Sequence, residues 1–183
     1  KKDEKYHNCS SVGSDEVGTG DYFGPIVGTA AYVKKEDVER LEKLGVGDSK
    51  KITDEKIKKI TPELIKIVKY RSMILTNQEY NEKYTKDINM NKIKAILHAR
   101  ENRYYEYLNS VPNIQRGITF MTKAEDKNLA VASASIISRY IFLKEFDKLC
   151  DSIHIPLPKG AGRDVDEIGE EVVEKYGEEK LKE

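Results

Sequence analysis

Tryptophan is absent from this sequence of 183 residues, and cysteine occurs only as Cys9 and Cys150. So few cysteines, so far apart, exclude the disulfide framework of a small secreted domain and a C-x-x-C metal site, so we expect two reduced structural thiols in a cytoplasmic protein. Long apolar runs are also absent, since none reaches the ~18 residues that a membrane span needs. The amino end, KKDEKYHNCS, has no signal-peptide core. We therefore predict no membrane partner.

The sequence also has no excess of charge of either sign, because Lys plus Arg and Asp plus Glu both total 32. A strongly basic domain would have indicated a nucleic-acid partner, and net charge gives no such indication here. The charged fraction of 35% exceeds the ~25% of an average soluble domain and indicates a heavily solvated surface. The length suits one domain with its own core. We expect a single domain over residues 1–183 and a monomer.

Short strands alternate with amphipathic helices along the chain, and small and β-branched residues mark the strands. Pro62 is expected to kink or divide the helix that contains it. This alternation predicts an α/β fold with a mixed central sheet flanked by helices. Strands are predicted at 8–18, 25–34, 68–76 and 117–122, and helices at 35–45, 53–68, 90–108, 128–150 and 164–176, with a hairpin joining the first two strands and a Pro/Gly loop at 153–162.

The segment SDEVGTGDYFGP, Ser14 to Pro25, places Asp15 and Glu16 at the end of an apolar strand. Two exposed acids in a polar turn would explain them equally well. However, no other charge lies between Asn8 and Gly20, and the sequence from Phe23 to Val33 is uncharged. Carboxylates in an apolar strand usually need a cation, most simply a metal ion with a preference for oxygen ligands. These acids are therefore candidate metal ligands.

The glycine turn that follows the acids consists of Gly18, Thr19 and Gly20. A tight hairpin needs residues that tolerate positive φ, which is explanation enough for glycine. The alternative is that the turn lets a sugar-phosphate strand approach the backbone closely. Beside a carboxylate pair, the turn becomes a candidate substrate cradle.

Two further polar clusters lie at the ends of predicted elements. GDSKK, at 47–51, contains Ser49, Lys50 and Lys51, which would either cap a helix or bind phosphate oxygens. MTKAEDKN, at 121–128, ends a predicted strand before the longest helix and contains Lys123 and Glu125. An acid there is either a favourable charge at a helix start or a ligand to a metal shared with Asp15.

In this order, SDEVGTGDYFGP, DSKK, TKAEDK and VASASIISRY resemble the type 2 ribonuclease H family, and within it ribonuclease HIII. The resemblance covers Ser11 to Tyr176 and includes the LPKGAG loop. Its most specific parts are the GTG turn and the Glu of TKAE, where ribonuclease HII enzymes typically show GRG and Asp. It implies a ribonuclease H-like fold and an endonuclease that cuts the RNA strand of an RNA/DNA hybrid with Mg²⁺ or Mn²⁺, leaving 3′-hydroxyl and 5′-phosphate ends.

The resemblance also implies a role for each matching residue. Asp15, Glu16 and Glu125 match catalytic carboxylates, which would hold two metal ions, with Asp15 bridging them. Gly18, Thr19 and Gly20 match the turn whose backbone contacts the ribose 2′-hydroxyl, the group that separates RNA from DNA. Lys50, Lys51 and Lys123 match basic positions near the scissile and neighbouring phosphates.

The match breaks between His98 and Arg100, where the family has a further strand ending in a catalytic Asp. A true deletion would remove a core strand and a metal ligand together, which a folded active enzyme should not tolerate. The alternative is a segment that belongs to the protein but not to this sequence. Asp164 and Asp166 are the first positions to check as substitutes. The family's amino-terminal substrate-binding domain is not visible either, so we expect the catalytic domain alone.

Two other classes of function stay open. A catalytically silent hybrid-binding domain would bind RNA/DNA hybrids without cutting them, and a true deletion would favour it. Another metal nuclease of the same fold, such as a junction resolvase, would have no need of a 2′-hydroxyl contact.

Overall fold

A computed structural model describes residues 8–47, 52–83 and 124–182. The predicted helix at 90–108 and strand at 117–122 lie outside these ranges. Within them, no helix combines the length and the apolarity that crossing a membrane requires.

Three antiparallel strands form the described sheet in the order β1-β2-β3. The strands are β1 (Ser11–Val17), β2 (Ile26–Val33) and β3 (Lys69–Leu75). β1 and β2 form the predicted hairpin, and every residue of the central strand β2 is buried. The described strands are all antiparallel, so a parallel strand of the predicted mixed sheet is not among them.

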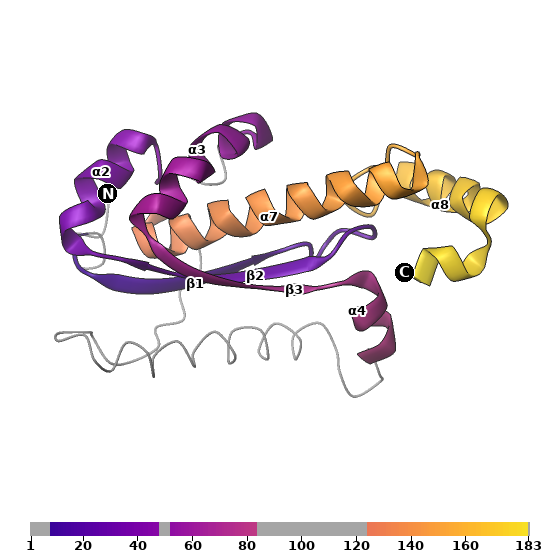
Figure 1. The fold of residues 1–183 in the computed structure, drawn as a ribbon, viewed down its shortest axis with the longest axis horizontal. Coiled ribbons are helices and arrows are strands. Elements are labelled where there is room, and N and C mark those ends of the chain that lie inside the picture. Colours follow the sequence, from indigo (N-terminus) through magenta and orange to yellow (C-terminus); the bar gives the residue numbers. More distant parts are fainter. Residues whose placement is uncertain (1–7, 48–51, 84–123, 183) are drawn as a thin grey trace.

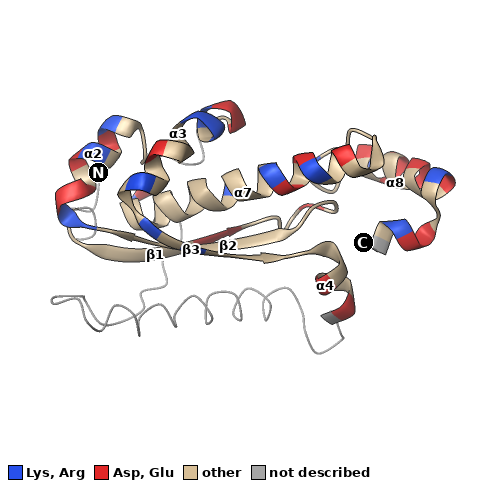
Figure 2. Ribbon diagram, viewed as in Figure 1, with Lys and Arg blue, Asp and Glu red and all other residues tan. Residues whose placement is uncertain are grey.

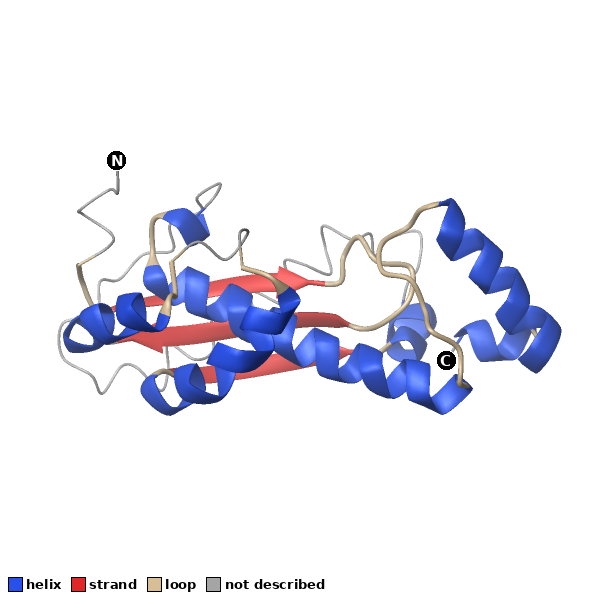
Figure 3. Cartoon of the chain, turned by 90° about the horizontal axis from the view of Figure 1, so that it is seen from above, coloured by secondary structure: helices blue, strands red, loops and turns tan. Residues whose placement is uncertain are grey.

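Helices α2 (Val38–Leu44), α3 (Asp54–Ile67) and α7 (Leu129–Ile153) lie over one face of this sheet (Figures 1 and 3). Their apolar sides pack with β2 into one buried core. Local signals set the ends of these helices. The side chain of Thr53 accepts the amide N–H of Lys56 at the start of α3, and Gly45 ends α2 with φ of 90°. Pro62 lies inside α3 and does not divide it.

The remaining described elements complete the fold. They are η1 (Lys35–Asp37), α4 (Asn77–Lys83), η3 (Ala124–Asp126), α8 (Arg163–Tyr176) and η4 (Glu178–Lys182). The predicted Pro/Gly loop connects α7 to α8, and α8 lies at the far end of the molecule from α2 (Figure 1).

Strand β1 runs alongside the amino-terminal half of α7, which carries no charged residue in its first ten positions (Figure 2). A Cβ at Gly13 would lie 2.3 Å from the amide nitrogen of Val131, so the two backbones are in close contact. Two residues along a strand span ~7 Å and four along a helix span ~6 Å, so strand and helix positions stay matched. Asp15 therefore lies beside Ser135, just as Gly13 lies beside Val131.

Candidate functional site

Asp15 is held by the small polar residues of α7. Its carboxylate hydrogen-bonds the side chain of Ser135. One helical turn further, the hydroxyl of Ser138 donates to the main-chain carbonyl of Asp15 over 3.1 Å. The predicted close approach of the Ala/Ser half of this helix therefore brings both serines to one residue of β1.

The surroundings of Asp15 disfavour its negative charge. Burial is the largest effect and raises the pKa of the carboxyl above its ordinary value of 3.8, and the charges of Glu16 and Glu125 raise it further. The hydrogen bond from Ser135 acts in the opposite direction. The structure thus brings Glu16 and Glu125 close enough to Asp15 to repel its charge, although Glu125 is 110 positions further along the chain.

Glu125 lies in the helical turn η3, directly before α7. Asn128 caps α7, because its side-chain oxygen accepts the amide N–H groups of Ala130 at 2.8 Å and Val131 at 3.1 Å. The amide nitrogen of the same side chain donates to the hydroxyl of Ser11 over 3.0 Å. This link fixes the start of the helix, and Glu125 with it, against β1.

Carboxylate oxygens are the ligands that Mg²⁺ and Mn²⁺ prefer. The repulsion that raises the pKa of Asp15 is what a divalent cation would offset. Within residues 8–47, 52–83 and 124–182, however, no three Asp, Glu, His or Cys side chains form a complete metal-binding group. Asp15, Glu16 and Glu125 therefore suit a divalent ion, but the site needs at least one further ligand to be complete.

The glycine turn divides into positions with different requirements. Gly18 has φ of 93°, and a Cβ there would lie 2.2 Å from the carbonyl oxygen of Pro25, so the hairpin geometry itself demands glycine. Gly20 is exposed, and a Cβ there would meet no atom within 4 Å. The close approach of Gly18 to Pro25, at the other end of the 18–25 connection, therefore accounts for Gly18 without the tight hairpin that the sequence suggested. The open space at Gly20 leaves room for a ligand to approach the backbone.

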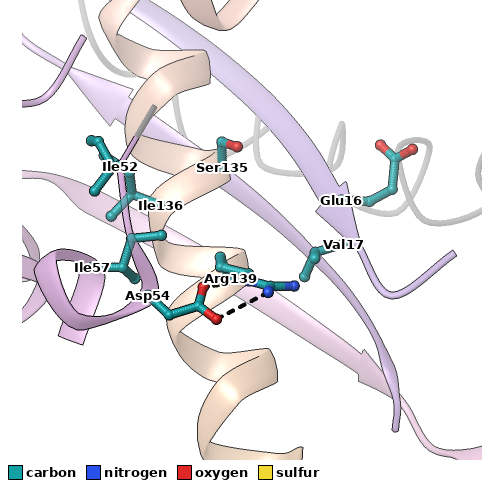
Figure 4. A pocket seen from close by; sticks show the side chains of 8 residues that line it. All are labelled: Glu16, Val17, Ile52, Asp54, Ile57, Ser135, Ile136 and Arg139. Atoms are coloured by element: carbon teal, nitrogen blue, oxygen red, sulfur yellow. Dashed lines mark hydrogen bonds and ion pairs between the residues drawn. The ribbon is translucent and has the colours of Figure 1, made fainter. Parts of the chain in front are cut away.

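A cavity of about 270 Å³ lies between β1, α3 and α7 (Figure 4). Arg139 spans it, with Nε 2.9 Å from Oδ1 of Asp54 and Nη2 3.2 Å from Oδ2. Glu16 lines the same cavity, and its carboxylate points away from the Asp54–Arg139 pair (Figure 4). The other lining residues are Val17, Ile52, Ile57, Ser135 and Ile136.

The sequence interpretation missed Asp54, Ser135 and Arg139 as residues of this site. Ser135 and Arg139 are four positions apart in the segment VASASIISRY, a spacing that places both on one face of a helix. That spacing was the available signal. Nothing local pointed to Asp54, which looked like an ordinary first-turn acid.

Other predicted positions are only partly accounted for. Ser49, Lys50, Lys51 and Lys123 lie outside the described ranges. Asp164 and Asp166 are exposed in the first turn of α8 and are not among the groups that shift the pKa of Asp15. Among the described residues, they form no metal-binding group with Asp15.

Comparison with known proteins gives consistent matches. The family model described as ribonuclease HII matches residues 12–113 and 98–183. Ribonuclease HIII of Bacillus cereus ATCC 10987 is 41% identical over 199 residues, covering 95% of this chain and 64% of that protein. The chain thus spans under two thirds of the length of this relative.

Solved structures match the fold as well. Bst-RNase HIII, crystallised in complex with Mn²⁺, is 37% identical with a TM-score of 0.87, and the match covers 98% of this chain and 66% of that one. RNase H3 of Aquifex aeolicus is 28% identical with a TM-score of 0.76, covering 90% and 68%. These matches confirm the predicted α/β, ribonuclease H-like fold.

Proposed function

Because the chain belongs to the ribonuclease HII family, we propose that it is an endonuclease that hydrolyses the RNA strand of RNA/DNA hybrids and leaves 3′-hydroxyl and 5′-phosphate ends. The observation that carries this proposal is the partly buried carboxylate of Asp15, whose pKa is raised by burial and by the charges of Glu16 and Glu125. The glycine turn begins three positions after Asp15, at Gly18, and has open space at Gly20. Carboxylates that repel one another favour a bound cation, and an accessible backbone beside them lets a nucleic-acid strand approach that cation.

Asp15, Glu16 and Glu125 would hold Mg²⁺ or Mn²⁺. When bound, such ions activate a water molecule and neutralise the charge that develops on phosphoryl oxygens. The protein contributes position. Ser135 donates to Asp15 and favours its charged form, and Ser138 holds the backbone beneath it.

Substrate contacts would come from segments on either side of these acids. The backbone of Gly18, Thr19 and Gly20 would contact the ribose 2′-hydroxyl, which is the group that distinguishes RNA from DNA. Ser49, Lys50, Lys51 and Lys123 would bind phosphates, so affinity for the hybrid should fall as salt rises.

A further acid would complete the site from a strand between His98 and Arg100. The match to the B. cereus relative extends over 199 residues, against 183 in this chain, which supports a segment of the relatives without a counterpart here. Among the described strands, β1 has a neighbour on one side only, so a further strand could pair there and end beside Asp15. We propose one catalytic domain over 1–183, with that segment belonging to the intact protein.

The test is a cleavage assay on an end-labelled RNA/DNA hybrid with Mg²⁺ or Mn²⁺. The native protein should cut the RNA strand, and Asp15→Asn should not. Native-rate cleavage by Asp15→Asn would remove the proposal. Hybrid bound in a salt-dependent way but left intact with Mn²⁺ would indicate a silent binder, and equal cleavage of a DNA duplex would indicate another metal nuclease.

The setting of the protein is also proposed. Cys9 and Cys150 are both thiols, which supports the reducing cytoplasm as its compartment. A monomer is the proposed state, and light scattering of the purified protein would test it.

A further inference from the structure

The loop that follows α7 reaches back to the glycine turn. The carbonyl of Gly160 accepts the amide N–H of Tyr22 over 2.8 Å, and the amide N–H of Gly160 donates to Oδ1 of Asp21 over 2.7 Å. Asp21 and Tyr22 directly follow Gly20, and the amide of Asp21 also donates to the carbonyl of Gly18 over 3.3 Å. One residue of a distant loop therefore holds the far side of the turn from two directions.

The residue before Gly160 anchors this loop. Nζ of Lys159 lies 3.0 Å from Oδ2 of Asp54, and its ammonium lies 5.9 Å from the ring centroid of Phe146. Asp54 is itself held by Arg139 through both carboxylate oxygens. A bidentate arginine fixes the orientation of a carboxylate, so Lys159 meets an acceptor whose position is already set.

This network connects the turn to the helix that holds the catalytic carboxylate. Arg139 lies one helical turn after Ser135, which hydrogen-bonds Asp15. A continuous series of contacts thus runs from Asp15 through α7 to Asp54, then through Lys159 and Gly160 to the glycine turn. The carboxylate contacts α7 directly, and the turn is connected to α7 through Asp54 at the start of α3.

Solvent exposure limits what the ion pair can add to stability. The side chains of Lys159 and Asp54 are 40% and 36% exposed, and pairs this accessible contribute little to the free energy of unfolding. Ile155 and Leu157 hold the first part of this loop in the core, whereas Lys159 is exposed, so the ion pair acts on the end of the loop that bonds to the turn. The role of this ion pair is therefore better explained by the position it gives the loop than by any contribution to stability.

We propose that Lys159 is a positioning residue that fixes the Gly18–Gly20 turn relative to Asp15 and so sharpens discrimination of the ribose 2′-hydroxyl. The inference rests on the proposed function, because the turn is taken to contact ribose. Lys159 acts through Gly160 and does not touch the substrate.

The test combines protein variants with substrate variants in a double-mutant cycle. Two hybrids are compared that differ only by a 2′-deoxy nucleotide on the 5′ side of the cut, and kcat/KM is measured for each. The native protein should show a large 2′-deoxy penalty, and Lys159→Met should reduce this penalty by roughly five- to tenfold, as coupled sites do. Lys159→Arg keeps the cation and should restore the penalty.

Lys58→Met is the matched control. Lys58 joins α3 to α7 through Oδ2 of Asp147 at 2.7 Å, and both side chains of this pair are exposed. Its charge also acts on Asp54, but its ion pair holds α7 and not the loop that carries Lys159 and Gly160. Lys58→Met should leave the penalty unchanged. An equal loss on both hybrids in Lys159→Met would overturn the proposal, because a general structural role or a direct phosphate contact would act on both substrates alike.

A second measurement does not depend on nuclease activity. Hydrogen exchange at the amide of Tyr22, which bonds to Gly160, should be about tenfold faster in Lys159→Met than in the native protein and unchanged in Lys58→Met. Unchanged exchange would overturn the positioning role. If exchange changes as expected but the native protein cuts neither hybrid, the positioning of the turn stands, while the proposed nuclease function and the discrimination built on it fail.

Discussion

The carboxylate of Asp15 on β1 accepts a hydrogen bond from the side chain of Ser135 on α7. The bond exists because Gly13 and the small residues of α7 allow the strand and the helix to approach within backbone contact. A larger residue at either place would move Asp15 away from the serine.

Replacing Ser135 should therefore weaken metal binding with little effect on the fold. Ser135→Ala removes the donor that favours ionised Asp15, so the pKa of Asp15 rises further and a metal must displace a proton more often. We expect Mn²⁺ affinity to fall roughly 10- to 100-fold, as for other residues that support metal ligands. Isothermal titration calorimetry checks this. Ser152→Ala, on the exposed carboxyl-terminal part of the same helix, should leave the affinity unchanged.

Asp15 should make the metal-free protein depend on pH in a defined direction. Its pKa is raised in the folded state above the ordinary 3.8, so the folded protein binds this proton more tightly than the unfolded chain does. Stability from this group therefore increases as pH falls through the raised pKa. Asp15→Asn should be more stable than the native protein at neutral pH, and the difference in Tm should shrink as pH falls towards about 4. A Tm difference independent of pH would contradict this account.

Divalent ions should reverse that order of stability. Mn²⁺ at about 100 times its Kd should raise the Tm of the native protein by about 5–10 °C, because it binds only the folded state. Asp15→Asn should lose this shift. The control is Asp166→Asn, an exposed acid on α8 that should keep the full shift. Loss of the shift in the control would place the ion elsewhere.

Glycine at position 13 should be essential for stability. Gly13→Ala puts a Cβ 2.3 Å from the amide nitrogen of Val131 and 2.6 Å from the carbonyl carbon of Ala130, both backbone atoms that cannot turn aside. We expect a loss of at least about 2 kcal/mol in urea unfolding. Gly169→Ala is the control, since a Cβ inside α8 would meet nothing within 4 Å and should stabilise by up to about 1 kcal/mol.

Asp54 should titrate in the opposite sense to Asp15. Arg139 first, and then Lys159, hold its pKa below the ordinary 3.8. Its contribution to stability is therefore present above the unfolded pKa and is lost as pH falls through the folded one. Asp54→Asn should have a lower Tm than the native protein above about pH 5, with the gap closing in stronger acid. A gap that persists at low pH would show that lost packing, not charge, is responsible.

Much of the fold followed from local signals. Thr53 predicted the start of α3 and Gly45 the end of α2, because capping depends on residues close in sequence. The β1–β2 hairpin was predicted from the glycine turn between two apolar strands. The continuous helix through Pro62 could not be predicted, because packing of its buried side chains against the core outweighs one lost backbone hydrogen bond.

The sequence by itself determined the kinds of residue in the site and their chemistry, since Asp15, Glu16 and the glycine turn are contiguous. Only the tertiary structure decided which distant residues complete their surroundings. Glu125 was expected from the resemblance, but Ser135, which bonds to Asp15, and Asp54, which lines the adjoining cavity, take their places from how α7 and α3 pack across the sheet. Burial and repulsion between carboxylates are properties of that packing, so the raised pKa of Asp15 could not be inferred from the residues next to it in the sequence.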